Sequence, residues 1–122
     1  MSDAKRYFKN IINKVSGLYL ILVTDIDGVQ LLRITPDDKN TDVASSFISS
    51  FVLSSDQAGK LGLGKHKSII SMYNNYQVLQ MNKNNLIVTF IGNDGNFIGH
   101  ILSIDSELDV HLNEIKNAVI ET

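Results

Sequence analysis

The 122-residue chain has the length of one domain, and its 43 % hydrophobic and 20 % charged residues are typical of a globular protein. A formal net charge of −2 argues against nucleic-acid binding by phosphate neutralisation and against a polybasic membrane-surface module. The absence of cysteine excludes disulfides, thiolate chemistry and cysteine-ligated zinc. No apolar run reaches the roughly 18 residues of a membrane span, and the first residues lack a signal peptide's apolar core. We expect a single soluble intracellular domain over residues 1–122.

The first part of the chain predicts a helix followed by a β-hairpin. Apolar residues at spacings of three and four predict a helix over 3–15, with a stop at Gly17. The uninterrupted apolar run 18–23 predicts a strand covered on both faces. Turn-forming residues at 25–28 connect this strand to a return strand over 29–34.

Residues 42–61 predict a second helix with an unusually wide apolar face. Its apolar residues, Phe47 and Phe51 among them, spread over about half of the helix circumference. Serines such as Ser50 and Ser54 stand between them, and small side chains allow another backbone to come close. The pattern fits a helix that packs against two surfaces, and it fits equally a core helix with a solvated serine face.

The second half predicts three strands and a last helix. The strands cover 68–73, 76–83 and 86–91, and the asparagine pairs between them suit tight hairpins because asparagine tolerates a left-handed backbone. The run 86–91 is apolar on both faces and is expected at the centre of the sheet. A helical stripe then extends over 98–119. The whole order predicts an α+β domain on one antiparallel sheet.

Motifs for catalysis and metal binding are incomplete. The glycine loop ending in Gly64-Lys65 has His66 where a P-loop needs serine or threonine, and a helix enters it while a strand leaves, the reverse of a phosphate site. Asp25-x-Asp27 lacks the later ligands of a calcium loop. We therefore expect no enzyme activity, no cofactor and no metal.

The three histidines, His66, His100 and His111, lack the i, i+4 spacing of a metal site. His111 and the acidic residues of the last helix are expected on its solvated face; these acids are Asp105, Glu107, Asp109 and Glu114.

Two surfaces remain as candidates for an interaction. The strand 68–73 follows a long connection and is placed at a sheet edge, where unpaired backbone groups can pair with another chain. The wide apolar face of the helix 42–61 offers further area for contact. Together they predict a dimerisation surface.

Several runs spread over essentially the whole chain match a known family. In the middle they are Phe47-x-x-x-Phe51, Ser55-Asp56-Gln57, Lys60-Leu61-Gly62-Leu63, Lys67-Ser68-Ile69-Ile70 and Asn75-Tyr76-Gln77-Val78-x-Gln80. The hairpin Asp25-x-Asp27-Gly28-Val29 and the ending Ile101-x-Ser103-x-x-x-Glu107-Leu108 match as well. On these runs the chain resembles the MEK-binding scaffold subunits of the Ragulator complex, members of the roadblock (dynein light chain) superfamily.

The resemblance implies the roadblock fold, α-β-β-α-β-β-β-α, with one helix on one face of a five-stranded antiparallel sheet and two on the other. It also implies a heterodimer with a second Ragulator roadblock subunit, in which the second helices pack together and the third strands pair edge to edge. The interface residues that we expect on these two elements are Phe47, Ser50, Phe51, Ser54, Ser68, Ile69, Ile70, Ser71 and Tyr73.

The function implied by the resemblance is non-catalytic. The heterodimer would be held at the cytoplasmic face of late endosomes and lysosomes by a lipidated Ragulator subunit, without inserting into the membrane or binding nucleic acid. There it would scaffold MEK and ERK and help to dock Rag GTPases in amino-acid signalling to mTOR. Two alternatives are direct GTPase regulation, for which Arg6 and Arg33 do not resemble an arginine finger, and a nucleotide-binding enzyme built on the glycine loop.

Overall fold

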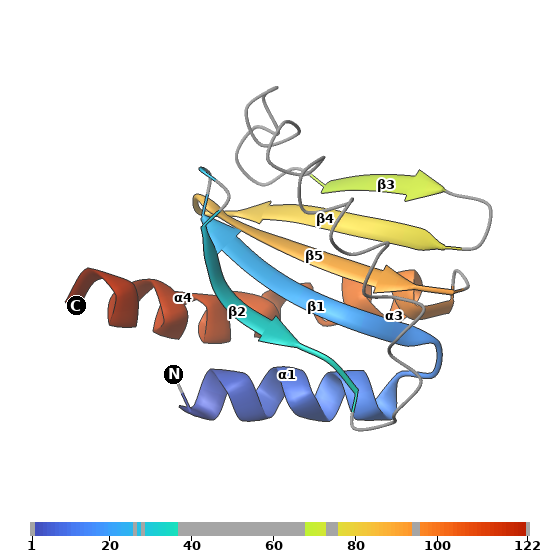
Figure 1. The fold of residues 1–122 in the computed structure, drawn as a ribbon, viewed down its shortest axis with the longest axis horizontal. Helices are drawn as coiled ribbons and strands as arrows, with labels where there is room; N and C mark the ends of the chain where they lie inside the picture. The colour runs from blue at the N-terminus through green and yellow to red at the C-terminus, as the bar shows by residue number, and fades with distance from the viewer. Residues whose placement is uncertain are drawn as a thin grey trace.

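The computed structural model shows an α+β arrangement in which helices cover one face of an antiparallel sheet (Figure 1). The structure describes residues 2–25, 27, 29–36, 68–72, 76–93 and 96–121. The described elements are α1 (Ser2–Lys14), β1 (Leu18–Asp25), β2 (Gln30–Ile34), β3 (Ser68–Met72), β4 (Gln77–Lys83), β5 (Leu86–Gly92), α3 (Asn96–Ser103) and α4 (Asp105–Glu121).

The sheet has the strand order β2-β1-β5-β4-β3, and every neighbouring pair is antiparallel. This confirms the predicted α+β class, the central position of β5 and the edge position of β3. Asn84 and Asn85 both have positive φ values, 55° and 71°, and form the tight turn between β4 and β5. The helix predicted over 42–61 lies outside the described residues.

The main core lies between the sheet and the helices α1, α3 and α4. Apolar positions of α1 fall on one stripe, and Phe8 from this stripe is fully buried. Gly17, which follows the end of α1, has a positive φ of 84°. This confirms the predicted end of the helix. Fully buried residues from the sheet and from the last two helices complete this core: Phe90, Phe97, Leu108 and Ile115.

The opposite face of the sheet is also buried, but its composition differs. Leu20, Leu22, Val78 and Ile91 form a small apolar cluster there. Next to it the buried Gln80 side-chain amide donates a 3.4 Å hydrogen bond to the Thr89 hydroxyl. Strand β1 is thus covered on both faces, as its uninterrupted apolar run predicts.

The prediction of one last helix over 98–119 is wrong, because α3 and α4 are separate helices that meet at Ile104. The Ile104 amide donates to the Ile101 carbonyl, and the Ser103 hydroxyl donates to the His100 carbonyl at 2.6 Å, so the end of α3 is tightened and closed. Ile101 and Leu108 are both fully buried on either side of the break. The apolar stripe therefore continues through the turn and hides it from a reading of periodicity.

Candidate interaction surface

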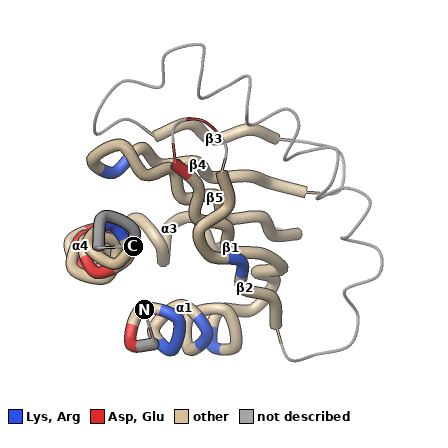
Figure 2. Tube along the Cα trace, turned by 60° about the vertical axis from the view of Figure 1, so that its left-hand side comes forward, with Lys and Arg blue, Asp and Glu red and all other residues tan. Residues whose placement is uncertain are grey.

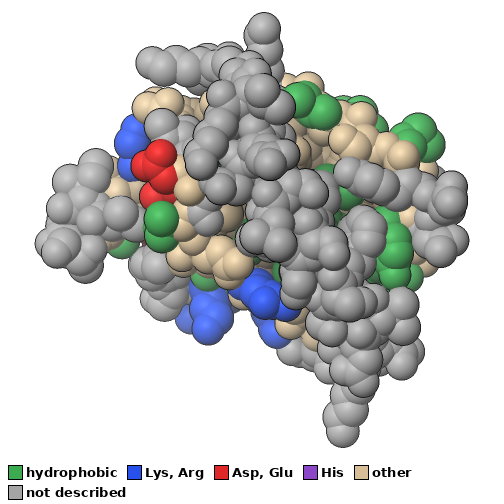
Figure 3. Space-filling view, turned by 45° about the horizontal axis from the view of Figure 1, so that its top comes forward, with side chains coloured by type: hydrophobic (Ala, Val, Ile, Leu, Met, Phe, Trp, Pro, Cys, Tyr) green, Lys and Arg blue, Asp and Glu red, His purple; other side chains and the backbone are tan. Residues whose placement is uncertain are grey.

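Strand β3 carries a group of exposed apolar side chains at one edge of the sheet. Ile69 is 43 % exposed, Ile70 is 50 % exposed and Met72 is 74 % exposed. Among the described strands, β3 pairs with β4 alone, so its outer backbone groups face away from the sheet. The space-filling view shows hydrophobic side chains at the surface of this part of the molecule (Figure 3). Such an edge is a template for pairing with a further strand.

The register of β3 against β4 divides its side chains between two faces. Ile70 lies opposite Leu79, which belongs to the main core, so Ile70 and Met72 share the face that carries the helices. Ile69 lies opposite Gln80 and is on the other face. A partner strand paired to β3 would therefore meet apolar side chains on both faces of the extended sheet.

The sequence of β3, Ser-Ile-Ile-Ser-Met, contains none of the devices that usually protect a sheet edge. It has no charged residue and no proline, both of which discourage pairing with another chain. The strand is thus chemically suited to a lasting contact between its edge and another polypeptide.

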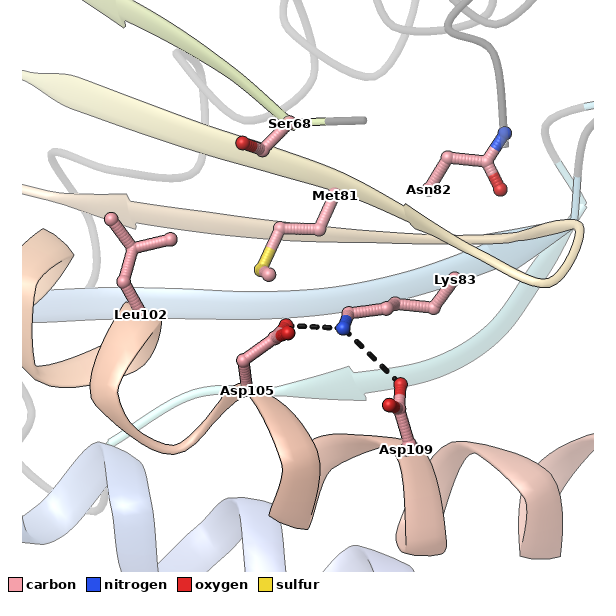
Figure 4. Close-up of a pocket in the computed structure, with 7 residues that line it drawn as sticks. All are labelled: Ser68, Met81, Asn82, Lys83, Leu102, Asp105 and Asp109. Atoms are coloured by element: carbon pink, nitrogen blue, oxygen red, sulfur yellow. Dashed lines mark ion pairs between the residues drawn. The ribbon is translucent and has the colours of Figure 1, made fainter. Parts of the chain in front are cut away.

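A pocket of about 270 Å³ lies beside the beginning of β3, between β4 and the junction of α3 with α4 (Figure 4). Lys83 projects into it from β4 and forms ion pairs with Asp105 and with Asp109, the latter at 3.2 Å. The Lys83 side chain is only 10 % exposed. The pocket is lined by Ser68, Met81, Asn82, Lys83, Leu102, Asp105 and Asp109.

The charge balance of this pocket makes Lys83 a structural cation. Burial by itself lowers the pKa of Lys83, but the hydrogen bonds and charges of Asp105 and Asp109 outweigh burial and raise the pKa above its ordinary value. A lysine that stays protonated is neither a nucleophile nor a general base. The ion pairs instead attach the first turns of α4 to β4, immediately beside the edge strand.

The solvated face expected at the start of the last helix is confirmed in part, since Glu107 and Asp109 are exposed. Asp105 and Asp109 are about half exposed, yet both pair with the buried Lys83. Sequence reasoning missed Lys83, because nothing in the alternation of β4 marks a lysine at the end of a strand as buried. The only signal is the position of two acids one helical turn apart at the start of α4.

The expectation that His111 is solvated on the helix surface is wrong. Its ring stacks on Tyr7 of α1, with ring centroids 3.8 Å apart and an angle of 13° between the planes. The Tyr7 hydroxyl donates a 3.2 Å hydrogen bond to Glu107 Oε2. Burial and the Glu107 carboxylate, which accepts this hydrogen bond, raise the pKa of Tyr7 to about 12. The contacts of Tyr7 with His111 and Glu107 therefore join α1 to α4.

The structure brings together the predicted interface residues of β3, namely Ser68, Ile69, Ile70 and Ser71. It adds Met72, which sequence reasoning missed although it stands two positions after Ile70 on the same face. The described residues contain no group of three or more side chains that could hold a metal. The remaining predicted interface residues, which lie outside the described part of the chain, are Phe47, Ser50, Phe51, Ser54 and Tyr73.

Comparison with known proteins identifies the family. The family model described as "Mitogen-activated protein kinase kinase 1 interacting" matches residues 2–119. The chain belongs to this family. The Ragulator complex protein LAMTOR3 homolog of Drosophila melanogaster is 53 % identical over 121 residues, covering 98 % of this chain and 97 % of the relative. Human Ragulator complex protein LAMTOR3 is 39 % identical over 118 residues, covering 96 % and 95 %.

Two solved structures with little sequence similarity to this family member have a similar fold. MglC from Myxococcus xanthus superimposes with a TM-score of 0.67 at 13 % identity, over 94 % of this chain and 98 % of that one. The gliding protein MglB from Thermus thermophilus gives a TM-score of 0.56 at 11 % identity, over 93 % and 88 %. Both are roadblock-fold proteins, and the chain has the roadblock fold.

Proposed function

We propose that this chain is a non-catalytic scaffold subunit that pairs through β3 with a second roadblock protein. The observation that carries the proposal is the unprotected edge of β3, with Ile69, Ile70 and Met72 exposed on it. Relatives along the whole chain are named as Ragulator complex proteins, and the family is described as interacting with a mitogen-activated protein kinase kinase. These names support a role in assembly rather than in a reaction.

The proposed pairing joins two sheets at their edges. Backbone N–H and C=O groups on the outer side of β3 bond to the partner strand, so that one sheet continues into the other. Ile70 and Met72 lose their solvent exposure on one face, and Ile69 loses its exposure on the other. Complete burial of a fully exposed side chain of this size stabilises by about 1.5–3 kcal/mol, and each of these three residues contributes the part of this value that its remaining exposure allows.

The assembled dimer is the platform for the remaining partners. In this proposal a lipidated Ragulator subunit holds it at the cytoplasmic face of late endosomes and lysosomes. There it supports MEK and ERK signalling and the docking of Rag GTPases in amino-acid signalling to mTOR. The described residues contain no helix that is long and apolar enough to cross a membrane.

The experiment that tests the pairing is a mass measurement by light scattering, on the chain alone and co-expressed with the second Ragulator roadblock subunit. We expect a 1:1 complex for the unchanged chain and a loss of affinity of more than about 100-fold for Ile70→Glu, because a buried unpaired charge is strongly unfavourable. The matched control is Val110→Glu on α4, at a residue 66 % exposed. An Ile70→Glu chain that still forms the complex would show that β3 is not the interface.

A further inference from the structure

A second surface feature lies between α1 and β2, away from β3. It is a groove of about 470 Å³, and both arginines of the chain line it. The tube view shows basic segments of α1 beside a basic segment of β2 (Figure 2). The space-filling view shows Lys and Arg side chains gathered toward the bottom of the molecule in that view (Figure 3). The lining residues are Lys5, Arg6, Lys9, Arg33, Ile34 and Thr35.

The positive charge of this groove is not balanced within it. Lys5 and Lys9 stand four positions apart on α1, a spacing at which like charges destabilise a helix. No acidic residue lines the groove, and within the described part of the chain Lys5, Arg6 and Arg33 form no ion pair. A chain with a net charge of −2 thus places four cations around one concavity.

The groove is also held in shape. The Lys9 ammonium donates a 3.1 Å hydrogen bond to the carbonyl of Thr35, which fixes α1 to the chain just after β2. Ile34 at the bottom of the groove is only 2 % exposed and belongs to the main core. Arg33 and Arg6 are exposed, and they present their planar guanidinium groups from two different elements. Such forks match the two oxygens of a carboxylate.

We propose that this groove binds an acidic segment of a partner protein, with carboxylates that pair with Arg6 and Arg33. A membrane surface fits less well, because the four cations converge on a hollow rather than a flat face. An amphipathic membrane-surface helix would also insert apolar side chains beside its charges. Among the described residues, no exposed large hydrophobic side chain belongs to α1 or β2.

The groove and the proposed dimer edge can be occupied together. Strands β2 and β3 lie at the two opposite edges of the sheet, with β1, β5 and β4 between them. A partner strand on β3 therefore leaves the groove accessible. The proposal does not depend on the pairing through β3, and each can fail without the other.

The test uses the full chain and two fluorescent peptides, an octamer of glutamate and an octamer of glutamine, with binding followed by fluorescence anisotropy. We expect the glutamate peptide to bind and the glutamine peptide not to bind. Arg33→Glu should weaken binding at least tenfold, and Arg33→Gln should weaken it less. The matched control is Lys14→Glu, which makes the same change in net charge at an exposed position of α1 outside the groove. Circular dichroism establishes that each variant is folded.

Three results would overturn the proposal. The first is an equal loss of affinity in Lys14→Glu, which would mean attraction by diffuse charge. The second is a glutamate peptide that does not bind at low salt, where charge pairing is strongest. The third is a chain that does not bind the glutamate peptide but binds phosphatidylserine vesicles, with vesicle binding lost in Arg33→Glu. This result would assign the groove to a lipid surface.

Discussion

The two edge strands of the sheet, β2 and β3, have five residues each but differ in charge and in solvent exposure. Strand β2 carries Arg33 and is packed against α1, while β3 carries no charge and exposes most of its side chains. Charged residues and covering helices are the usual means of protecting a sheet edge, and β2 has both. The two edges of the sheet therefore differ. The β2 edge is protected by α1 and by a charged residue, whereas β3 has neither protection within the described part of the chain.

The apolar content of the two strands does not account for this difference. Each strand contains isoleucine, yet Ile34 of β2 is 2 % exposed and Ile70 of β3 is 50 % exposed. Ile34 reaches the main core because α1 lies over the β2 side of the sheet. On the β3 side the same residue type remains half exposed. The position of each isoleucine relative to the helices, rather than its residue type, therefore decides its exposure.

The sharpest test of this comparison is the same substitution at both edges. Ile34→Ala should reduce the free energy of unfolding by about 2–5 kcal/mol, because it leaves a cavity in the main core. Ile70→Ala should reduce it by less than about 1 kcal/mol in the isolated chain, since little buried contact is lost. Urea unfolding of the two variants beside the unchanged chain measures both. Equal losses would mean that the two edges are equally part of the core.

A smaller effect is expected from Lys83, which fixes α4 to β4 near the open edge. Lys83→Met keeps most of the side-chain volume but leaves Asp105 and Asp109 without their cation. Because both carboxylates are about half exposed, the loss should be about 1 kcal/mol. Lys14→Met, at an exposed position of α1, is the control and should change stability by less than about 0.5 kcal/mol.

The pH dependence of this pair follows from the raised pKa of Lys83. A folded-state pKa above the unfolded value means that the stabilisation is complete below the ordinary lysine pKa of about 10.4 and is lost as pH rises through the higher value. The advantage of the unchanged chain over Lys83→Met should thus be constant between neutral pH and about pH 10 and shrink above it. An advantage that disappears well below that range would contradict the ion pairs as its cause.

How much of this the sequence could predict depends on the range of the interactions involved. Alternation, asparagine turns and the apolar run of β5 are local patterns, and they predicted the strands and the α+β class correctly. The break at Ile104 was missed because the buried face continues across it. The partners of Lys83 and His111 were missed because each contact joins residues that are distant in sequence. The edge position of β3 was predictable from its long connection, and strand alternation already places Met72 on the face of Ile70, although the sequence reading did not use it.

The smallest expected effect concerns Tyr7, which attaches α1, the helix that closes the β2 edge, to α4. The pKa of Tyr7 is raised to about 12, chiefly by burial and further by Glu107, so part of the tyrosinate absorbance should develop only near that pH. This component should be absent in Tyr7→Phe and retained in Tyr19→Phe, which changes a tyrosine paired edge to face with Tyr76 instead. Since the folded pKa exceeds the unfolded value of about 10, the stability of the unchanged chain should decline between about pH 10 and pH 12 more steeply than that of Tyr7→Phe. If Tyr7→Phe kept the component near pH 12, that component would not belong to Tyr7, and the contact of α1 with the rest of the molecule would then depend on its apolar stripe.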